Sequence, residues 1–294
     1  MIKSFDLTTH AKHDSAHCLA PNLFRTIKRG DKKKLKLDIQ YEFNKDEILR
    51  FVCFEPLDVS DMRLLQALVA LAGPSEIILD LDSPSSDAAK ELIKILDPKH
   101  SALLDESRVV NVNLSNLLAE CGLENGGSNR KKAIESLIRL SNVTIIANIN
   151  KKVWSCHLLS FAMDEINKKI FVALNPRITD AVLGNKRYTT ISMEEVRAIK
   201  TDAGAILHQR LCAIVDLGKT RAIKEETMIG YIWPKDDNVN TNIKSDNLRQ
   251  RKTRLKKAIK DISNAGGWKF IENGSGAITV SRSNNKKSEK LFTN

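Results

Sequence analysis

Apolar and polar positions alternate with a helical period near the C-terminal end of the chain. Over residues 246–265 one narrow face of a predicted helix is apolar at 100° per residue. The apolar positions are Leu248, Leu255, Ile259 and Ile262. Gly266 and Gly267 then end the helix. The segments WKFIE and AITVSR follow on either side of a glycine-containing turn, and they predict a two-stranded hairpin.

The same order of elements is predicted in the first half of the chain. That half contains, in order, a hairpin (35–54), a helix that starts at Asp58 or Ser60 and is ended by Gly73, an insertion with a helix (87–96), a strand (108–111), two helices (114–121 and 128–140) and a hairpin that turns at 150–152. The second half contains a helix (201–215), a strand (221–224), a helix (225–232), the helix at 246–265 and the final hairpin.

This repeated order predicts an α+β fold with two tandem winged-helix domains. We place an N-terminal tail at 1–18, the first winged-helix domain at 19–174, the second at 175–283 and a flexible C-terminal tail at 284–294. Strands at 169–176 and 187–192 flank the junction, and a short helix starts at Pro176.

The charge of the chain indicates its binding partner. The chain has 47 Lys and Arg against 36 Asp and Glu, so its formal charge is +11, which favours polyanions. Seven basic residues and no acid lie between Arg249 and Lys260. Such a density of like charge repels itself unless phosphates neutralise it. A basic helix followed by a hairpin therefore predicts a winged helix that binds double-stranded DNA.

Both predicted recognition helices supply candidate DNA contacts. In the helix over 128–140, Ile134, Leu137 and Ile138 are predicted to face the core, with the polar side chains outward. The expected contacts in the first half are Asn129, Arg130, Lys132, Ser136, Arg139, Lys151 and Lys152. Those in the second half are Arg249, Arg251, Lys252, Thr253, Arg254, Lys256, Lys257 and Lys260. Arg251 and Lys252 flank the apolar stripe, so their stems could instead pack along it.

The sequence predicts neither nucleotide binding by a P-loop nor catalysis by a nucleophilic side chain. The segment DLGKT at 216–220 resembles the end of a P-loop, but the first glycine of that motif would fall at Ala213, and a helix precedes it. The tyrosines Tyr41, Tyr188 and Tyr231 have no histidine cluster nearby in the sequence. We expect no catalytic residues and no cofactor.

Two groups of residues have spacings that zinc sites use. His13, His17 and Cys18 lie close together, and His208 and Cys212 are one helical turn apart, but four ligands must converge and packing explains each residue. Asp80 and Asp82 lie two positions apart, and a solvated loop explains both of them. We therefore expect no metal, and the alternative is a metal-dependent DNA nuclease that uses His13, His17 or the pair Asp80 and Asp82.

The sequence also predicts where the protein acts. The longest apolar run, Leu64–Ala72, is far shorter than the ~20 residues that cross a membrane. The N-terminus has no apolar core of a secretory signal, and the five cysteines form no CxxC pair, so we expect reduced thiols in the cytoplasm.

Several long sequence blocks point to a family. They are HDSAHCLAPNLFRTIKRG from His13, EPLDVSDMRLLQALVALAGP from Glu55, FVALNPRITDAVLG from Phe171, ISMEEVRAI from Ile191 and LHQRLCAIVDLGKT from Leu207. Over about residues 13–283 the chain resembles the RepC replication initiators of IncQ-type plasmids. The resemblance implies paired winged-helix domains that bind directly repeated origin elements called iterons. In the last recognition helix it carries the family's arginines onto Arg249, Arg251 and Arg254, whereas Lys256 and Lys257 replace its further charges.

The resemblance also implies partners. It predicts a bacterial, non-enzymatic initiator that opens origin DNA and helps to load a separate plasmid-encoded helicase and primase, acting as a monomer or a homodimer. Recognition helices ~34–36 Å apart would cover about 20 base pairs of duplex. The main alternative is a winged-helix transcriptional repressor, which would bind a promoter palindrome instead of tandem direct repeats.

Overall fold

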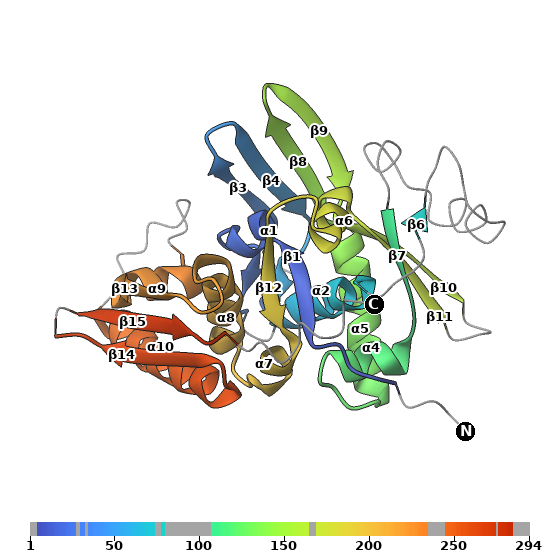
Figure 1. The fold of residues 1–294 in the computed structure, drawn as a ribbon. Coiled ribbons are helices and arrows are strands. Elements are labelled where there is room, and N and C mark those ends of the chain that lie inside the picture. The colour runs from blue at the N-terminus through green and yellow to red at the C-terminus, as the bar shows by residue number, and fades with distance from the viewer. Residues whose placement is uncertain are drawn as a thin grey trace. The chain divides into compact units, whose positions relative to one another are not determined.

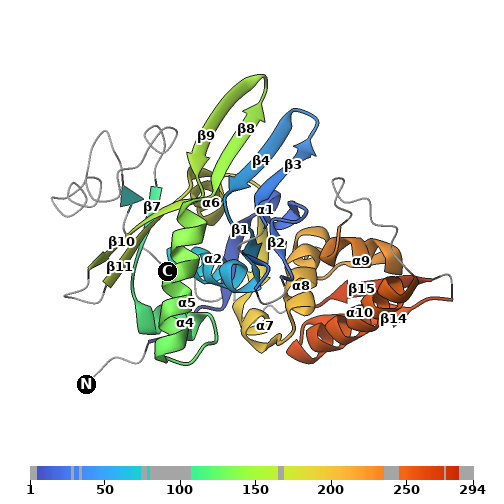
Figure 2. The same cartoon turned by 180° about the vertical axis from the view of Figure 1, so that it is seen from behind.

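The computed structural model has a mixed α+β fold in two compact units (Figures 1 and 2). The first unit spans Met1–Met193 and the second spans Glu194–Asn294. The structure describes residues 5–27, 30–32, 35–73, 78–79, 107–164, 169–234, 245–274 and 276–284. The predicted helix at 87–96, Asp80, Asp82 and the predicted tail from residue 285 onward lie outside these residues.

Two four-stranded sheets dominate the first unit. The sheet with the order β3-β4-β8-β9 is antiparallel and consists of β3 (Leu37–Asn44), β4 (Glu47–Cys53), β8 (Thr144–Ile149) and β9 (Lys152–His157). The sheet with the order β10-β11-β7-β6 consists of β6 (Ile78–Leu79), β7 (Ser107–Asn113), β10 (Leu159–Asp164) and β11 (Lys169–Leu174). The predicted hairpin over 35–54 is confirmed as β3 and β4.

Helices cover and connect these sheets. They are α1 (Ser15–Leu19), α2 (Val59–Ala72), α4 (Leu114–Glu120), α5 (Gly127–Ser141) and α6 (Pro176–Leu183), and a short parallel pair joins β2 (Phe24–Arg25) to β5 (Leu57–Asp58). A capping box at Asp58 and Asp61 starts α2, which buries Leu64, Leu65 and Leu68 and packs against α5. Pro176 occupies the first turn of α6, and the Asn175 side chain caps it.

The N-terminal segment is part of the core of the first unit. Strand β1 (His10–Asp14) pairs with β12 (Tyr188–Ser192) in an antiparallel register, and Ala11 and Ala16 are fully buried. The prediction of a tail over 1–18 is therefore wrong from residue 10 onward. The segment that carries α6 and β12 also packs in the first unit, because both elements contact β1, whereas we placed it after a boundary at 174.

The second unit combines helices with one antiparallel sheet. After α7 (Met193–Ala198) come α8 (Asp202–Ile214), β13 (Thr220–Lys224), α9 (Glu225–Ile232), α10 (Ser245–Ala265), β14 (Trp268–Glu272) and β15 (Ala277–Arg282). The sheet has the order β13-β15-β14. The helices and strands of this unit from α8 onward match those predicted from periodicity, whereas α7 was not predicted. Helix α10 packs mainly on α8.

The structure also bears on the expected state of the cysteines and on membrane insertion. All five cysteines are buried and free of disulfide bonds. None of the helices in the described part of the chain combines the length and the apolar character that crossing a bilayer requires.

Candidate nucleic-acid interface

Helix α10 has one buried face and one cationic face. Leu255, Ala258 and Ile262 are fully buried, whereas Leu248 is 40% exposed, so the predicted apolar stripe is wrong at its first position. Ala258 takes part in the buried face instead. The exposed side chains on the described part of α10 include Arg249, Thr253, Arg254, Lys256, Lys257 and Lys260. We call the five basic members of this set the α10 ridge.

Two other basic side chains of α10 are engaged within the second unit. Lys252 Nζ lies 2.7 Å from Glu225 Oε2 at the start of α9, and this hydrogen bond raises the pKa of Lys252. The Arg251 guanidinium lies 5.9 Å from the centre of the Trp233 ring. Arg251 is partly buried, which agrees with a stem that packs along the core, whereas the Lys252 side chain is 45% exposed.

A polar hollow of about 390 Å³ lies beside the α10 ridge. It is formed by α10, the first residue of α9 and the turn between β14 and β15. Arg249, Lys252 and Lys256 line it together with Glu225 and Glu272. The hollow therefore contains acceptors as well as donors, a mixture that suits polar groups such as base edges.

An acidic side chain fixes α10 on the start of α8. Asp261 Oδ2 accepts hydrogen bonds from the amides of Lys200 and Thr201 at 3.0 and 2.7 Å, and from Thr201 Oγ1 at 2.7 Å. Thr201 in turn caps α8 by accepting from the Gly204 amide. The orientation of α10 is thus held by polar contacts in addition to its buried stripe.

Helix α5 presents fewer cations than α10. Arg130 and Lys132 are exposed on it, and Arg130 Nε donates to Asn125 Oδ1 at 2.7 Å. Asn129 is partly exposed and donates to the Glu124 carbonyl oxygen at 2.9 Å. Lys151 and Lys152 are exposed where β8 turns into β9, and Lys151 has a φ of 65°.

Two residues that we expected to face outward on α5 face the protein. Ser136 is only 2% exposed, and the Arg139 side chain is 12% exposed and pairs with the fully buried Asp61 at 2.9 Å. Burial alone would lower the pKa of Arg139, but the contact with Asp61 outweighs it and raises that pKa. Ile138, which we assigned to the core, is 44% exposed. The buried face of α5 is Ala133, Ser136, Leu137 and Leu140.

Sequence reasoning missed other exposed cations near these elements. Lys131 is exposed on α5 between two predicted contacts, and Lys269 is exposed on β14. The run NRKK at 129–132 was the available signal for Lys131. Lys269 alternates with the buried Trp268, so the period of two in a strand identifies it as outward.

The sequence model of the replication protein C (RepC) family matches residues 4–284. The chain belongs to the RepC family. Membership connects this RepC-family protein with the initiation of DNA replication, as the resemblance of its sequence blocks predicted.

Two solved structures are similar to this RepC-family protein. Both are crystal structures of domains 2 and 3 of RctB, each 10% identical in sequence. One has a TM-score of 0.56 and covers 92% of this chain and 98% of that chain; the other has a TM-score of 0.52 and covers 92% and 96%. At this identity the likeness concerns the fold alone. No curated protein sequence matches the chain.

The structure also places the P-loop-like segment and the two groups of zinc-type residues of this RepC-family protein. The segment at 216–220 follows helix α8 and leads into strand β13, which is the reverse of the strand-to-helix order of a P-loop. His13, His17 and Cys18 are buried in β1 and α1. Within the described ranges, the ligand atoms that converge in a group of three or more belong to Glu195, His208 and Cys212 instead.

Proposed function

We propose that this protein is a non-enzymatic replication initiator that binds directly repeated iterons in double-stranded plasmid origin DNA. The observation that carries the proposal is the α10 ridge, which leaves five cations exposed opposite a fully buried stripe. A helix of this kind can enter a major groove while its cations reach phosphates. The family supports the same role, because its members are replication proteins.

The proposal includes a winged helix in each unit. In the second unit the order α8, β13, α9, α10, β14 and β15 makes α10 the recognition helix and the β14–β15 hairpin the wing. In the first unit the order α2, β7, α4, α5, β8 and β9 gives α5 and the β8–β9 hairpin the same roles. The exposed Lys151 and Lys152 at the turn of the β8–β9 hairpin and the exposed cations of α5 and α10 support this assignment.

The contacts divide into two classes. Phosphates would pair with lysines and arginines around each helix, namely Arg130, Lys132, Lys151, Lys152, Lys256, Lys257 and Lys260. Base edges would be read by Arg249, Thr253 and Arg254 on α10 and by Asn129 on α5. Arg251 and Lys252 support the helix from within the unit, and Ser136 and Arg139 are left out because they face the protein.

Binding energy would perform the mechanical work at the origin. Several copies on adjacent repeats bend or strain the neighbouring duplex, and easily deformed A·T-rich steps lower the cost of opening it. A separate helicase and primase would then act on the opened strands, so this chain needs no catalytic group. It would act in the bacterial cytoplasm as a monomer or a homodimer.

A footprint of the purified protein across the DNA next to its reading frame tests the proposal. Protection of tandem direct repeats is the expected result, whereas protection of one inverted repeat would favour the repressor alternative. Incubation of the same supercoiled DNA with Mg²⁺ tests the nuclease alternative, because persistent nicking would contradict a non-enzymatic role. Replacement of Arg254 by Ala should cost ~1–3 kcal/mol of binding and relax the preference at one base pair.

A further inference from the structure

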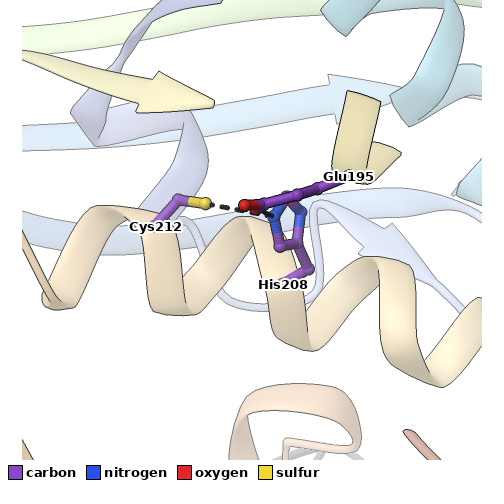
Figure 3. Close-up of side chains that lie close together, drawn as sticks. All are labelled: Glu195, His208 and Cys212. Carbon is purple, nitrogen blue, oxygen red and sulfur yellow. Dashed lines mark hydrogen bonds and ion pairs between the residues drawn. The ribbon is translucent and has the colours of Figure 1, made fainter. Parts of the chain in front are cut away.

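A cluster of three ligand-type side chains is buried inside the second unit (Figure 3). Glu195 comes from α7, and His208 and Cys212 lie one turn apart on α8. Their exposed fractions are 9%, 1% and 3%. One ligand atom of each residue lies within 4.8 Å of the other two. Each of these polar groups loses its contact with water on burial, and the contacts that the carboxylate, the imidazole and the thiol make with one another offset that loss.

The spacing of the two α8 ligands fits a tetrahedral metal. Cys212 Sγ lies 3.5 Å from His208 Nε2. Zinc bonds of about 2.3 Å to sulfur and 2.0–2.1 Å to nitrogen, at a tetrahedral angle, place these atoms about 3.5–3.6 Å apart. Glu195 Oε2 is at hydrogen-bond distance from Nε2, 2.6 Å, and would move outward to about 3.3 Å on coordination. The pair on the helix is therefore already spaced as a chelate.

Groups behind the cluster would orient the carboxylate. Trp268 Nε1 donates to Glu195 Oε2 at 2.8 Å, which is the hydrogen bond that metal-binding carboxylates usually receive from their surroundings. Gly267 leaves the space that the carboxylate occupies, because an added Cβ there would clash with Glu195 Oε1. Arg282 lies over the Trp268 ring and donates to the carbonyl oxygens of Cys212 and Val215.

We propose that Glu195, His208 and Cys212 bind one divalent transition metal of the zinc class. Nitrogen, sulfur and carboxylate oxygen are the donors that zinc takes, whereas Mg²⁺ and Ca²⁺ take oxygen ligands. On binding, the Cys212 thiol and His208 Nε2 give up their protons, and both form bonds to the metal. The thiolate and the carboxylate together balance the two positive charges, and nothing is oxidised or reduced. A water molecule or the second carboxylate oxygen fills the fourth position.

The proton is the natural competitor of the metal for His208. Burial lowers the pKa of His208, but the contacts with Cys212 and Glu195 outweigh it and raise that pKa to about 9. Metal uptake is therefore best measured in mildly alkaline buffer. The nearby Arg282 guanidinium adds a fixed positive charge, which opposes the binding of a cation, so the thiolate and the carboxylate must both be ionised to hold the metal.

Cobalt(II) titration of the full chain tests the proposal. The protein is stripped with a chelator, kept reduced and titrated without DNA, while absorption is recorded in the visible and near-ultraviolet ranges. We expect one equivalent to bind, with a thiolate-to-cobalt charge-transfer band that Zn²⁺ removes by displacement. Cys212→Ser should lose the band, whereas the matched control Cys53→Ser, a buried cysteine of the first unit, should keep it.

Further variants keep the test decisive if Cys212→Ser does not fold. Each of the other four cysteines changed singly to Ser should retain the band, which assigns it to Cys212 by elimination. Trp268→Phe removes the hydrogen bond to Glu195 and should weaken affinity by about 10–100-fold. Absence of the band in the unaltered chain, its loss in Cys53→Ser, or unsaturable binding by an adventitious ion only would each overturn the proposal. None of these results bears on DNA binding, which the assay does not involve.

Discussion

Arg139 Nε and Nη2 both donate to Asp61 Oδ1, at 3.1 and 2.9 Å, although the residues are 78 positions apart. Asp61 also accepts from Lys32 Nζ at 3.0 Å and from the Asp58 amide at 2.8 Å. Its side chain has no exposed surface. One carboxylate therefore joins the start of α2, the end of α5 and the segment before β3.

Replacement of Asp61 should destabilise the first unit strongly. Asp61→Ala leaves the largely buried Arg139 guanidinium without its anion, and breaking a buried ion pair from one side costs about 3–5 kcal/mol. The free energy of unfolding, measured by urea denaturation, should fall by about that amount. Arg139→Met should also destabilise the fold, but the folded fraction should bind DNA as tightly as the unaltered chain.

The Arg50–Asp38 pair provides the matched control for Asp61. Its atoms lie 2.7 Å apart, but its side chains are 45% and 52% exposed. An exposed ion pair contributes about 0–1 kcal/mol, so Asp38→Ala should change the unfolding free energy by no more than that. An effect of Asp38→Ala equal to that of Asp61→Ala would remove burial as the explanation.

The salt dependence of DNA binding should distinguish the free cations of α10 from the paired one. If each protomer neutralises 6–10 phosphates, log affinity falls against log salt with a slope of about −5 to −9. Lys256→Ala should reduce the steepness of that slope by about 1, because this exposed lysine is expected to pair with one phosphate. Fluorescence anisotropy with a labelled origin duplex over a salt series measures both values.

Lys252→Ala serves as the comparison on the same helix. Glu225 already neutralises Lys252. Replacement of Lys252 should therefore lower the number of counterions released on DNA binding by less than replacement of Lys256 does. The slope should therefore change by clearly less. Equal slopes for the two variants would argue against the distinction between the α10 ridge and a lysine that is paired with Glu225.

Local patterns predicted most helices and strands because their causes are local. The capping residues of α2, the proline of α6 and the glycines after α10 lie beside the elements that they start or end. The pairing of β1 with β12 was not predictable in the same way, since the partners are some 178 residues apart and neither strand encodes the other. The segment over 154–161 contributes to two sheets through β9 and β10, and its local pattern contains no signal for that division.

The sequence predicted the candidate interface where its cause is the local helical period, and not where a distant residue determines it. Helical periodicity located the buried face of α10 at Leu255 and Ile262, but it does not reveal where the core ends, so Leu248 was assigned wrongly. On α5 the polarity of Ser136 and Arg139 suggested solvent. Their inward orientation depends on Asp61, a partner distant in sequence that periodicity does not contain.

Acid should weaken the first unit through a buried pair of histidines. His17 is fully buried, both of its ring nitrogens lack a hydrogen-bond partner in the described structure, and burial lowers its pKa to about 3 despite Asp14 nearby. His13 and Arg177 lower that pKa further, and the pKa of His13 is lowered as well. Between pH 6.5 and about 3 the unfolded chain binds a proton that the folded chain does not. Stability should therefore be complete above pH 6.5 and fall with pH, by up to about 1.4 kcal/mol per unit for each histidine.

Denaturation of the chain at several pH values measures this slope. His17→Leu should reduce the slope in the same window without abolishing it, because His13 still contributes. The exposed His157 is the control, and His157→Leu should leave the slope unchanged. A slope unaffected by His17→Leu would show that other groups carry the acid sensitivity.

Asp261 should stabilise the start of α8 from α10. Asp261→Ala removes the acceptor of three hydrogen bonds, two from backbone amides, and leaves the Thr201 amide without its partner. Loss of an acceptor for partly buried donors costs about 1–3 kcal/mol. Hydrogen exchange should therefore accelerate in the first turn of α8, and the second unit should unfold at lower denaturant concentration.

Two further variants separate this role from charge alone. Asp261→Asn retains an acceptor oxygen but loses the negative charge, so it should preserve more of the protection of α8 than Asp261→Ala. Glu272→Ala removes an exposed acid from β14 and should leave exchange in α8 unchanged. Because Asp261 also orients the helix that carries the ridge, Asp261→Ala should weaken DNA binding although it removes a negative charge, whereas a purely electrostatic effect would strengthen it. Tighter binding by a folded Asp261→Ala protein would therefore contradict the positioning role.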